Sequence, residues 1–185
     1  MSAPLLEVDG LTVTFPTARG PVDVVKGISF TLGRERLGIV GESGSGKSMT
    51  GRSILRLIRK PGKVTARRMA FDGIDLLSRS ERQMRDLRGA RISMVMQDPK
   101  FSLNPVMTVG EQIAEALVTH KKLPRRELKE RVLAMLEAVR INDPARVAGL
   151  YPHEVSGGMG QRIMIAMMLI PEPDLLIADE PTSAL

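Results

Sequence analysis

Residues 39–48 read Ile-Val-Gly-Glu-Ser-Gly-Ser-Gly-Lys-Ser, a short apolar run that leads into a glycine-rich loop and a Lys-Ser pair. Glycines let the backbone curl so that successive N–H groups can point inward at phosphate oxygens. A helix that begins at such a loop directs its positive end at the same anion. The pattern therefore predicts a phosphate-binding loop and a nucleoside triphosphate ligand. The residues expected to bind it are Gly41, Glu42, Ser43, Gly44, Ser45, Gly46, Lys47 and Ser48.

The last two residues of this loop carry its chemistry. Lys47 can reach the β- and γ-phosphates, and the hydroxyl of Ser48 can hold Mg²⁺. The alternative is a flexible Gly/Ser turn, but a chance loop would rarely carry both Lys and Ser at these offsets. A nucleoside triphosphate and Mg²⁺ are accordingly the expected ligands.

Composition sets the frame for this site. At 185 residues, with 43% hydrophobic and 26% charged residues, the chain is expected to be one globular domain, or one domain with an inserted lobe. The absence of cysteine excludes disulfides and thiolate metal sites. The N-terminal sequence does not resemble a signal peptide. The longest apolar run, Ile163 to Ile170, is far shorter than the roughly 18–20 residues that span a bilayer.

The formal net charge of +6 raises the question of a nucleic-acid partner. Basic residues gather between residues 52 and 68 and again between 121 and 131. Aromatic residues make up only 3% of the chain and do not interleave with these clusters, so base-stacking platforms are not evident. Solvated helix faces are the favoured interpretation, and contact with anionic lipid or a protein partner comes next. No nucleic acid is expected.

Hydrophobic periodicity predicts strands that alternate with helices. Strands are expected at 11–15, 28–32, 37–40, 69–71, 91–97 and 175–178, and helices at 47–58, around 128–139 and at 161–170. Strands and helices in this order around a phosphate loop indicate an α/β fold with a largely parallel core sheet.

A second motif, Leu175-Leu176-Ile177-Ala178-Asp179-Glu180, places two carboxylates directly after a buried strand. Ligands of α/β proteins bind at the carboxyl ends of such strands. Asp179 is placed to support the Mg²⁺ shell, and Glu180 to polarise a water for in-line attack on the γ-phosphate. Standing alone, the pair could equally be a cap at a strand–helix turn.

A third motif, Ser156-Gly157-Gly158, opens an apolar helix. Ser156 can cap that helix while the glycines expose backbone N–H groups, which makes a second anion site. One nucleotide has little use for two such sites in one molecule. Two copies, or two related proteins, could hold ATP between the phosphate loop of one and the Ser-Gly-Gly helix of the other.

Together these motifs resemble the nucleotide-binding subunits of ATP-binding-cassette transporters. The phosphate loop, the VMQDP segment around Gln97, the Ser-Gly-Gly signature and LLIADEPTSAL occur in that family's order, and the match covers essentially the whole chain. Within the family, MQDPKFSLNPVMTVGEQIAEAL and YPHEVSGGMGQRIMIAM resemble the dipeptide, oligopeptide and nickel importer branch, with peptide import the first expectation and nickel the second.

The resemblance implies a phosphate-loop NTPase core with a mostly parallel sheet, an N-terminal antiparallel β subdomain and an inserted helical lobe. The β subdomain and phosphate-loop core would occupy 1–98, the helical lobe 99–155, and the signature helix with the Walker B strand 156–185. Phe15 stands where the family keeps an aromatic residue that stacks on adenine, although an edge-strand core Phe is an alternative. Gln97 matches the residue that reaches Mg²⁺ and the attacking water. Lys47, Gln97 and Glu180 are thus the implied catalytic residues, and Ser48, Gln97 and Asp179 the implied metal ligands.

The resemblance also implies partners and a location. These are two transmembrane permeases, a second ATP-binding subunit that is identical or related, and indirectly a solute-binding protein. The location would be the cytoplasmic side of the inner membrane, as a peripheral subunit. Alternatives are a soluble cassette ATPase that acts on nucleic acid and a non-catalytic remnant; a small-molecule kinase explains neither the signature nor the Gln97 loop.

The sequence departs from the family pattern in two places. Val155 replaces the commoner Leu, and Gly160 adds a flexible residue to the first turn of the signature helix, at a cost of about 0.5–1 kcal/mol relative to Ala. The chain also stops before the aspartate and the switch histidine that the family places next, so the C-terminal part of the core is missing. Either the reading frame is partial or another chain supplies the missing strand.

We therefore expect the purified chain 1–185 to hydrolyse ATP slowly or not at all, because central strands of the core would lack ladder partners. Phosphate release by the purified chain tests this expectation. A turnover rate typical of complete family members would contradict it.

Overall fold

The structure is a computed structural model that describes residues 3–96 and 103–180. The chain divides into two compact units, Met1–Arg85 and Asp86–Leu185. Gln97 and residues 181–185 lie outside the described residues, so the predicted role of Gln97 has no structural counterpart here.

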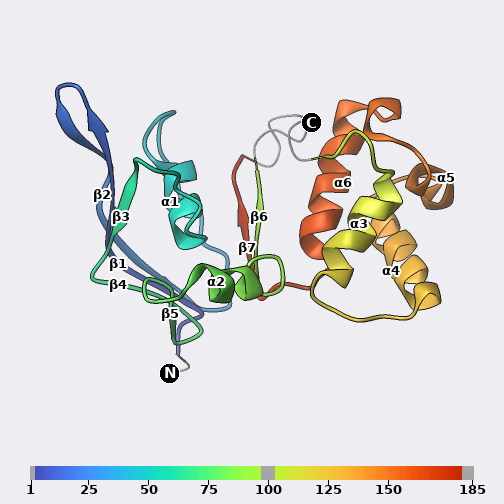
Figure 1. The fold of residues 1–185 in the computed structure, drawn as a ribbon, viewed down its shortest axis with the longest axis horizontal. Coiled ribbons are helices and arrows are strands. Elements are labelled where there is room, and N and C mark those ends of the chain that lie inside the picture. The colour runs from blue at the N-terminus through green and yellow to red at the C-terminus, as the bar shows by residue number, and fades with distance from the viewer. Residues whose placement is uncertain (1–2, 97–102, 181–185) are drawn as a thin grey trace. The chain divides into compact units, whose positions relative to one another are not determined.

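The first unit is built on an antiparallel sheet (Figure 1). Its strands are β1 (Leu6–Thr17), β2 (Gly20–Leu32), β3 (Lys63–Thr65), β4 (Arg68–Phe71) and β5 (Ile74–Asp75). They lie in the order β2-β1-β4-β5, and β3 also pairs with β1. Helix α1 (Lys47–Ile54) packs against β1 and β2, and α2 (Glu81–Leu87) includes the boundary between the two units. The strands predicted at 11–15, 28–32 and 69–71 are confirmed, and the first two extend well beyond their predicted limits.

The alternation of buried and exposed residues shifts by one residue within β1, which allows all of its apolar residues to face the core. Leu6 and Val8 are buried, but the next buried residues are Leu11 and Val13, which have the opposite parity. One extra residue must therefore be accommodated between them, since alternate residues of a strand face opposite sides. The register between β1 and β2 shifts there, and Gly10 adopts φ 64°. This geometry is that of a β-bulge with glycine in the left-handed region.

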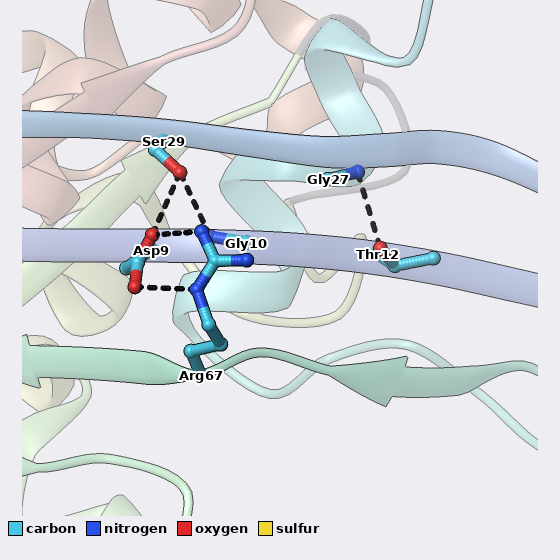
Figure 2. A network of polar contacts seen from close by, with 6 residues as sticks. All are labelled: Asp9, Gly10, Thr12, Gly27, Ser29 and Arg67. Carbon is cyan, nitrogen blue, oxygen red and sulfur yellow. Dashed lines mark hydrogen bonds and ion pairs between the residues drawn. The ribbon is translucent and has the colours of Figure 1, made fainter.

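Hydroxyl groups satisfy the backbone donors that the irregular register leaves over (Figure 2). The N–H of Gly10 donates to Ser29 Oγ at 2.9 Å, and the N–H of Gly27, on β2, donates to Thr12 Oγ1 at 3.1 Å. Each strand thus lends a side-chain acceptor to a glycine of the other. The exchange replaces ladder bonds that a regular hairpin would have made.

An ion pair extends this network to the strand connection that precedes β4. Arg67 donates from Nε to Asp9 Oδ2 at 2.8 Å, and the Ser29 hydroxyl donates to Asp9 Oδ1 at 3.0 Å (Figure 2). The hydrogen bond from Arg67 is the main reason that the pKa of Asp9 lies below its usual value. A lowered carboxyl pKa stabilises the fold above the unfolded-state pKa, and that contribution is lost as the pH falls through the folded-state pKa.

The second unit combines a parallel strand pair with a cluster of helices. Strands β6 (Ile92–Val95) and β7 (Leu175–Ala178) pair in parallel, from Ile92 opposite Leu175 to Val95 opposite Ala178. The helices are α3 (Val109–Val118), α4 (Arg125–Ala138), α5 (Pro144–Ala148), the 3₁₀ turn η2 (Pro152–Glu154) and α6 (Gly157–Leu169). Among the described residues, no helix is long and apolar enough to span a membrane.

The helices share one apolar core. Its buried members are Val109, Ile113, Leu117, Val132, Leu136, Ile141, Val147, Ile163, Ala166 and Ile170. On α3 and α4 these residues recur at helical spacing, so one stripe of each helix faces the core. Thr108 and Glu111 form a reciprocal capping box that fixes the start of α3.

One predicted strand is absent, and two predicted helices have other limits. Residues 37–40 form no strand, since none of the strands of the described chain pairs with them, and Val40 is 96% exposed. The helix predicted at 47–58 ends at Ile54, where Arg56 turns the chain with φ 52°. The signature helix begins at Gly157, directly after the predicted cap Ser156 and four residues before the range 161–170 that its apolar residues indicated.

Leu136→Ala is expected to destabilise the helical cluster by about 2–5 kcal/mol, because the side chain is fully buried and leaves a cavity. Urea unfolding followed by circular dichroism measures the loss. Leu133→Ala on the same helix is the matched control, since Leu133 is only half-buried and should cost much less. Equal losses would contradict the assignment of the core.

Candidate nucleotide-binding site

The phosphate loop lies in the first unit, between residues 41 and 46, and ends where α1 begins at Lys47. Gly46 is the N-cap of α1 with φ 94° and ψ 7°, and Gly44 has φ 82°. A Cβ at Gly46 would lie 2.6 Å from the backbone oxygen of Val24, whereas one at Gly44 would meet nothing within 4 Å. Gly46 is therefore required twice, by its left-handed conformation and by its contact with β2.

The side chain of Lys47 closes the loop. Its Nζ donates to the carbonyl oxygens of Gly41 and Glu42, at 2.8 Å each. The N–H of Ser45 donates to the Glu42 oxygen at 3.2 Å, which tightens the same turn. The ammonium group is thus held by two neutral acceptors rather than by a carboxylate. Phosphate oxygens would be stronger partners, because hydrogen bonds between ionised groups are stronger than those to a neutral carbonyl.

The start of α1 offers an uncompensated positive end. No acidic residue lies in its first turn, and its N-cap makes no side-chain hydrogen bond. Thr50 turns inward, and both its N–H and its hydroxyl donate to the Gly46 oxygen, at 2.9 and 3.0 Å. Ser48, the second residue of the helix, is half-buried beside the loop. The first-turn N–H groups and the helix dipole therefore favour an anion at the loop.

Phe15 belongs to the same unit as the loop. It lies near the end of β1, is half-buried, and pairs with Val22 of β2. The Pro61-Gly62 pair predicts only the end of a helix, and nothing in the linear sequence marks Gly62 as a neighbour of Phe15. The structure nevertheless brings them together: the tip of the Phe15 ring lies against Gly62.

The two predicted carboxylates lie in the second unit, at the carboxyl end of the parallel strand pair. Asp179 is 7% exposed, and its N–H donates to the oxygen of Val95 at 3.0 Å, one step beyond β7. Glu180 follows with φ 47° in the left-handed region. That conformation is uncommon for a residue other than glycine.

The signature residues also lie in the second unit and form the start of α6. Ser156 is the N-cap, and its Oγ accepts a hydrogen bond from the N–H of Met159 at 3.3 Å, so the predicted cap is confirmed. Gly157 and Gly158 are the first helical residues, and a Cβ at either would meet nothing within 4 Å. Within the described chain, the space beside both glycines is therefore open.

A pocket of about 270 Å³ borders this helix start. It is lined by Leu103, Pro105, Pro152, His153, Val155, Ser156, Gly157 and Gly160.

The geometry thus falls into two groups. A loop that is shaped for phosphate stands with Phe15 in one unit, and a carboxylate pair stands with a glycine-opened helix in the other. The sequence model of the family described as ABC transporter matches residues 25–183, and the chain belongs to this family. The predicted family and fold class are confirmed.

Several named relatives of the chain are peptide-transport proteins. The chain is 51% identical over 183 residues to the dipeptide transport ATP-binding protein DppD of Bacillus subtilis, which covers 98% of this chain and 55% of that protein. It is 49% identical to the oligopeptide transport ATP-binding protein OppD of Salmonella typhimurium, over 98% of this chain and 54% of that protein. The chain therefore spans about half the length of the curated relatives it matches.

A solved structure shares the fold. A dimeric ATP-binding cassette in a post-hydrolysis state, bound to ADP and Pi, superposes with a TM-score of 0.87 at 27% sequence identity. The match covers 97% of this chain and 75% of that one.

Gly46→Ala is expected to destabilise the fold more than Gly44→Ala. Both substitutions place a side chain at positive φ, which costs about 1–2 kcal/mol, but only the Gly46 variant also forces a Cβ against the Val24 oxygen. Urea unfolding of the two variants measures the difference. Equal free energies of unfolding would show that the contact with β2 contributes nothing.

Proposed function

We propose that the chain is the ATP-binding, energy-coupling part of an importer for di- or oligopeptides, acting at the cytoplasmic side of the inner membrane. The observation that carries the proposal is the combination of a preformed phosphate loop with about 50% identity to named peptide-transport ATP-binding proteins. The nickel alternative has no such support among these relatives.

The site residues fit ATP and Mg²⁺. Lys47 would neutralise the β- and γ-phosphates after leaving the Gly41 and Glu42 carbonyls. Oxygen ligands suit Mg²⁺, and Ser48 and Asp179 supply a hydroxyl and a carboxylate, with Gln97 as a third ligand. Bound Mg²⁺ would neutralise charge on the phosphates. Glu180 would orient a water and draw off its proton as the γ-phosphate is attacked.

A second subunit completes the proposed site. The N–H groups at Gly157 and Gly158 and the hydroxyl of Ser156 would contact the γ-phosphate of ATP bound to the partner's phosphate loop. The open surface around these glycines supports this arrangement, as does the dimeric state of the solved relative. ATP binding would then close the pair and hydrolysis would reopen it, whether the partner is identical or related.

The helical cluster is the proposed contact with the permeases. A pocket of about 490 Å³ lies between α3, α4 and α5. It is lined by Gly110, Glu111, Ala114, Arg125, Arg126, Leu128, Lys129, Val132, Leu133, Ala145 and Ala148. An apolar floor with a charged rim suits a short helix of a membrane partner. A solute-binding protein would act on the permeases from the other side of the membrane.

Lys47→Ala is expected to weaken ATP binding by at least about tenfold, because it removes a charge-assisted contact to phosphate worth about 1.5–3 kcal/mol. Crosslinking of a labelled azido-ATP to the purified chain measures binding. Lys122→Ala, at an exposed loop position outside the site, should label like the wild type. Equal labelling of the Lys47 variant would refute the site.

The transport part of the proposal needs its own readout. In cells that produce the whole transporter, uptake of a labelled dipeptide should fall to background with Lys47→Ala and persist with Lys122→Ala. Dipeptide uptake that is unchanged by Lys47→Ala would refute the proposed role in peptide import. It would not affect the proposal that the chain binds ATP.

A further inference from the structure

Gly62 lies one residue before β3, next to the ring of Phe15. Strand β3 pairs antiparallel with β1 in three consecutive steps, which end with Thr14 opposite Lys63. One further step along this ladder would set Phe15 opposite Gly62. On its other side, Phe15 pairs with Val22 of β2. The ring is therefore flanked by one residue with a side chain and one without.

The missing side chain at position 62 is filled by its neighbours. A Cβ there would lie 2.7 Å from Cε1 and 2.8 Å from Cζ of Phe15, and 2.7 Å from Cγ2 of Ile58. Carbon atoms in ordinary contact are about 3.5–4.0 Å apart. The ring of Phe15 and the methyl group of Ile58 thus occupy the volume that any residue larger than glycine would need.

The backbone does not require glycine at this position. Gly62 is absent from the residues with positive φ, unlike Gly44 and Gly46, so its conformation is open to alanine. Its N–H donates to the oxygen of Arg59 at 3.0 Å, and an alanine would retain this bond. An alanine would, however, force the aromatic ring of Phe15 to move.

We infer that Gly62 is a positioning residue for the nucleotide base: its lack of a side chain sets the Phe15 ring in the orientation that receives a purine. The inference rests on the proposed function and on the role that the family resemblance implies for Phe15, which is to stack on the adenine of ATP. Gly62 touches the ring and not the nucleotide. A side chain at position 62 would push the ring away from Ile58 and Gly62 and so change the face that it presents to a base, and it would leave the phosphate loop as it is.

The test compares a ligand that has a base with one that has none. Gly62→Ala should weaken binding of MgATP by about fivefold to tenfold, as expected for partial loss of base–aromatic stacking. Binding of magnesium tripolyphosphate, which engages only the phosphate loop, should be unchanged. Isothermal titration calorimetry of the full chain measures both ligands. Gly149→Ala is the matched control, because its φ is −86° and its Cβ would make only an ordinary contact at 3.5 Å.

A double-mutant cycle shows whether Gly62 acts through Phe15. Phe15→Ala removes the ring, so adding Gly62→Ala to that variant should leave the MgATP affinity where Phe15→Ala alone puts it. Additive losses would overturn the inference, because they would mean that Gly62 acts independently of the ring. A Gly62→Ala variant that binds both ligands equally weakly would also overturn it, since the effect would then be a general loss of structure.

Two further outcomes separate the inference from the proposed function. If the wild type binds MgATP and neither Phe15→Ala nor Gly62→Ala changes the affinity, ATP binding stands and the role of Gly62 is refuted. If the folded wild type binds tripolyphosphate but shows no added affinity for MgATP, the base platform itself fails, and the inference fails with it.

Discussion

The close approach of the phosphate loop to β2 is the constraint on which the first unit depends. Gly46 can lie against the oxygen of Val24 only because it carries no side chain, and its left-handed conformation is what starts α1 at Lys47. Phe15 stands on β1, the partner of β2 in the same hairpin. The loop that would hold the phosphates and the ring that would hold the base are therefore positioned by one pair of strands.

This dependence gives the irregular register of the hairpin a functional meaning. The bulge at Gly10 changes the face of every residue that follows it, so it decides that Leu11 and Val13 are buried. Without that shift, Phe15 would point to the opposite face of the sheet. The hydroxyls of Thr12 and Ser29 satisfy the two glycine amides at these irregular positions and so stabilise the strand that carries Phe15.

Local signals in the sequence predicted much of this molecule. The start of α1 after a glycine loop, the Ser156 cap and the strand before Asp179 depend on residues that are adjacent in the chain, and all three are observed. The strand at 37–40 was predicted wrongly because a run of apolar residues shows burial, not a ladder partner, and partners are set by distant segments. The contact between Gly62 and Phe15 escaped for the same reason, since it follows from the register of β3 on β1.

The positive and negative residues are distributed unequally over the two units. Residues 1–85 carry fifteen Lys and Arg against eight Asp and Glu, whereas residues 86–185 carry twelve against thirteen. The positive excess thus belongs to the unit with the phosphate loop. A positive field raises the local concentration of a polyphosphate anion. Binding of single-stranded nucleic acid would in addition need aromatic side chains on which successive bases stack.

The helices of the described chain differ in whether an acidic residue lies at their N-terminus. Helices α2, α3, α4 and the turn η2 carry a glutamate in the first turn, and α5 is capped by Asp143, so each has an anion of its own at its positive end. Helices α1 and α6 have no acidic residue there, and their caps are Gly46 and the neutral Ser156. A carboxylate at these two ends would stabilise the free helix by about 0.3–1 kcal/mol, yet it would repel a phosphate from the same N–H groups. Their absence from these two helices alone, among those described, agrees with the proposed function, in which the α1 end binds the ATP of this chain and the α6 end the ATP of the partner.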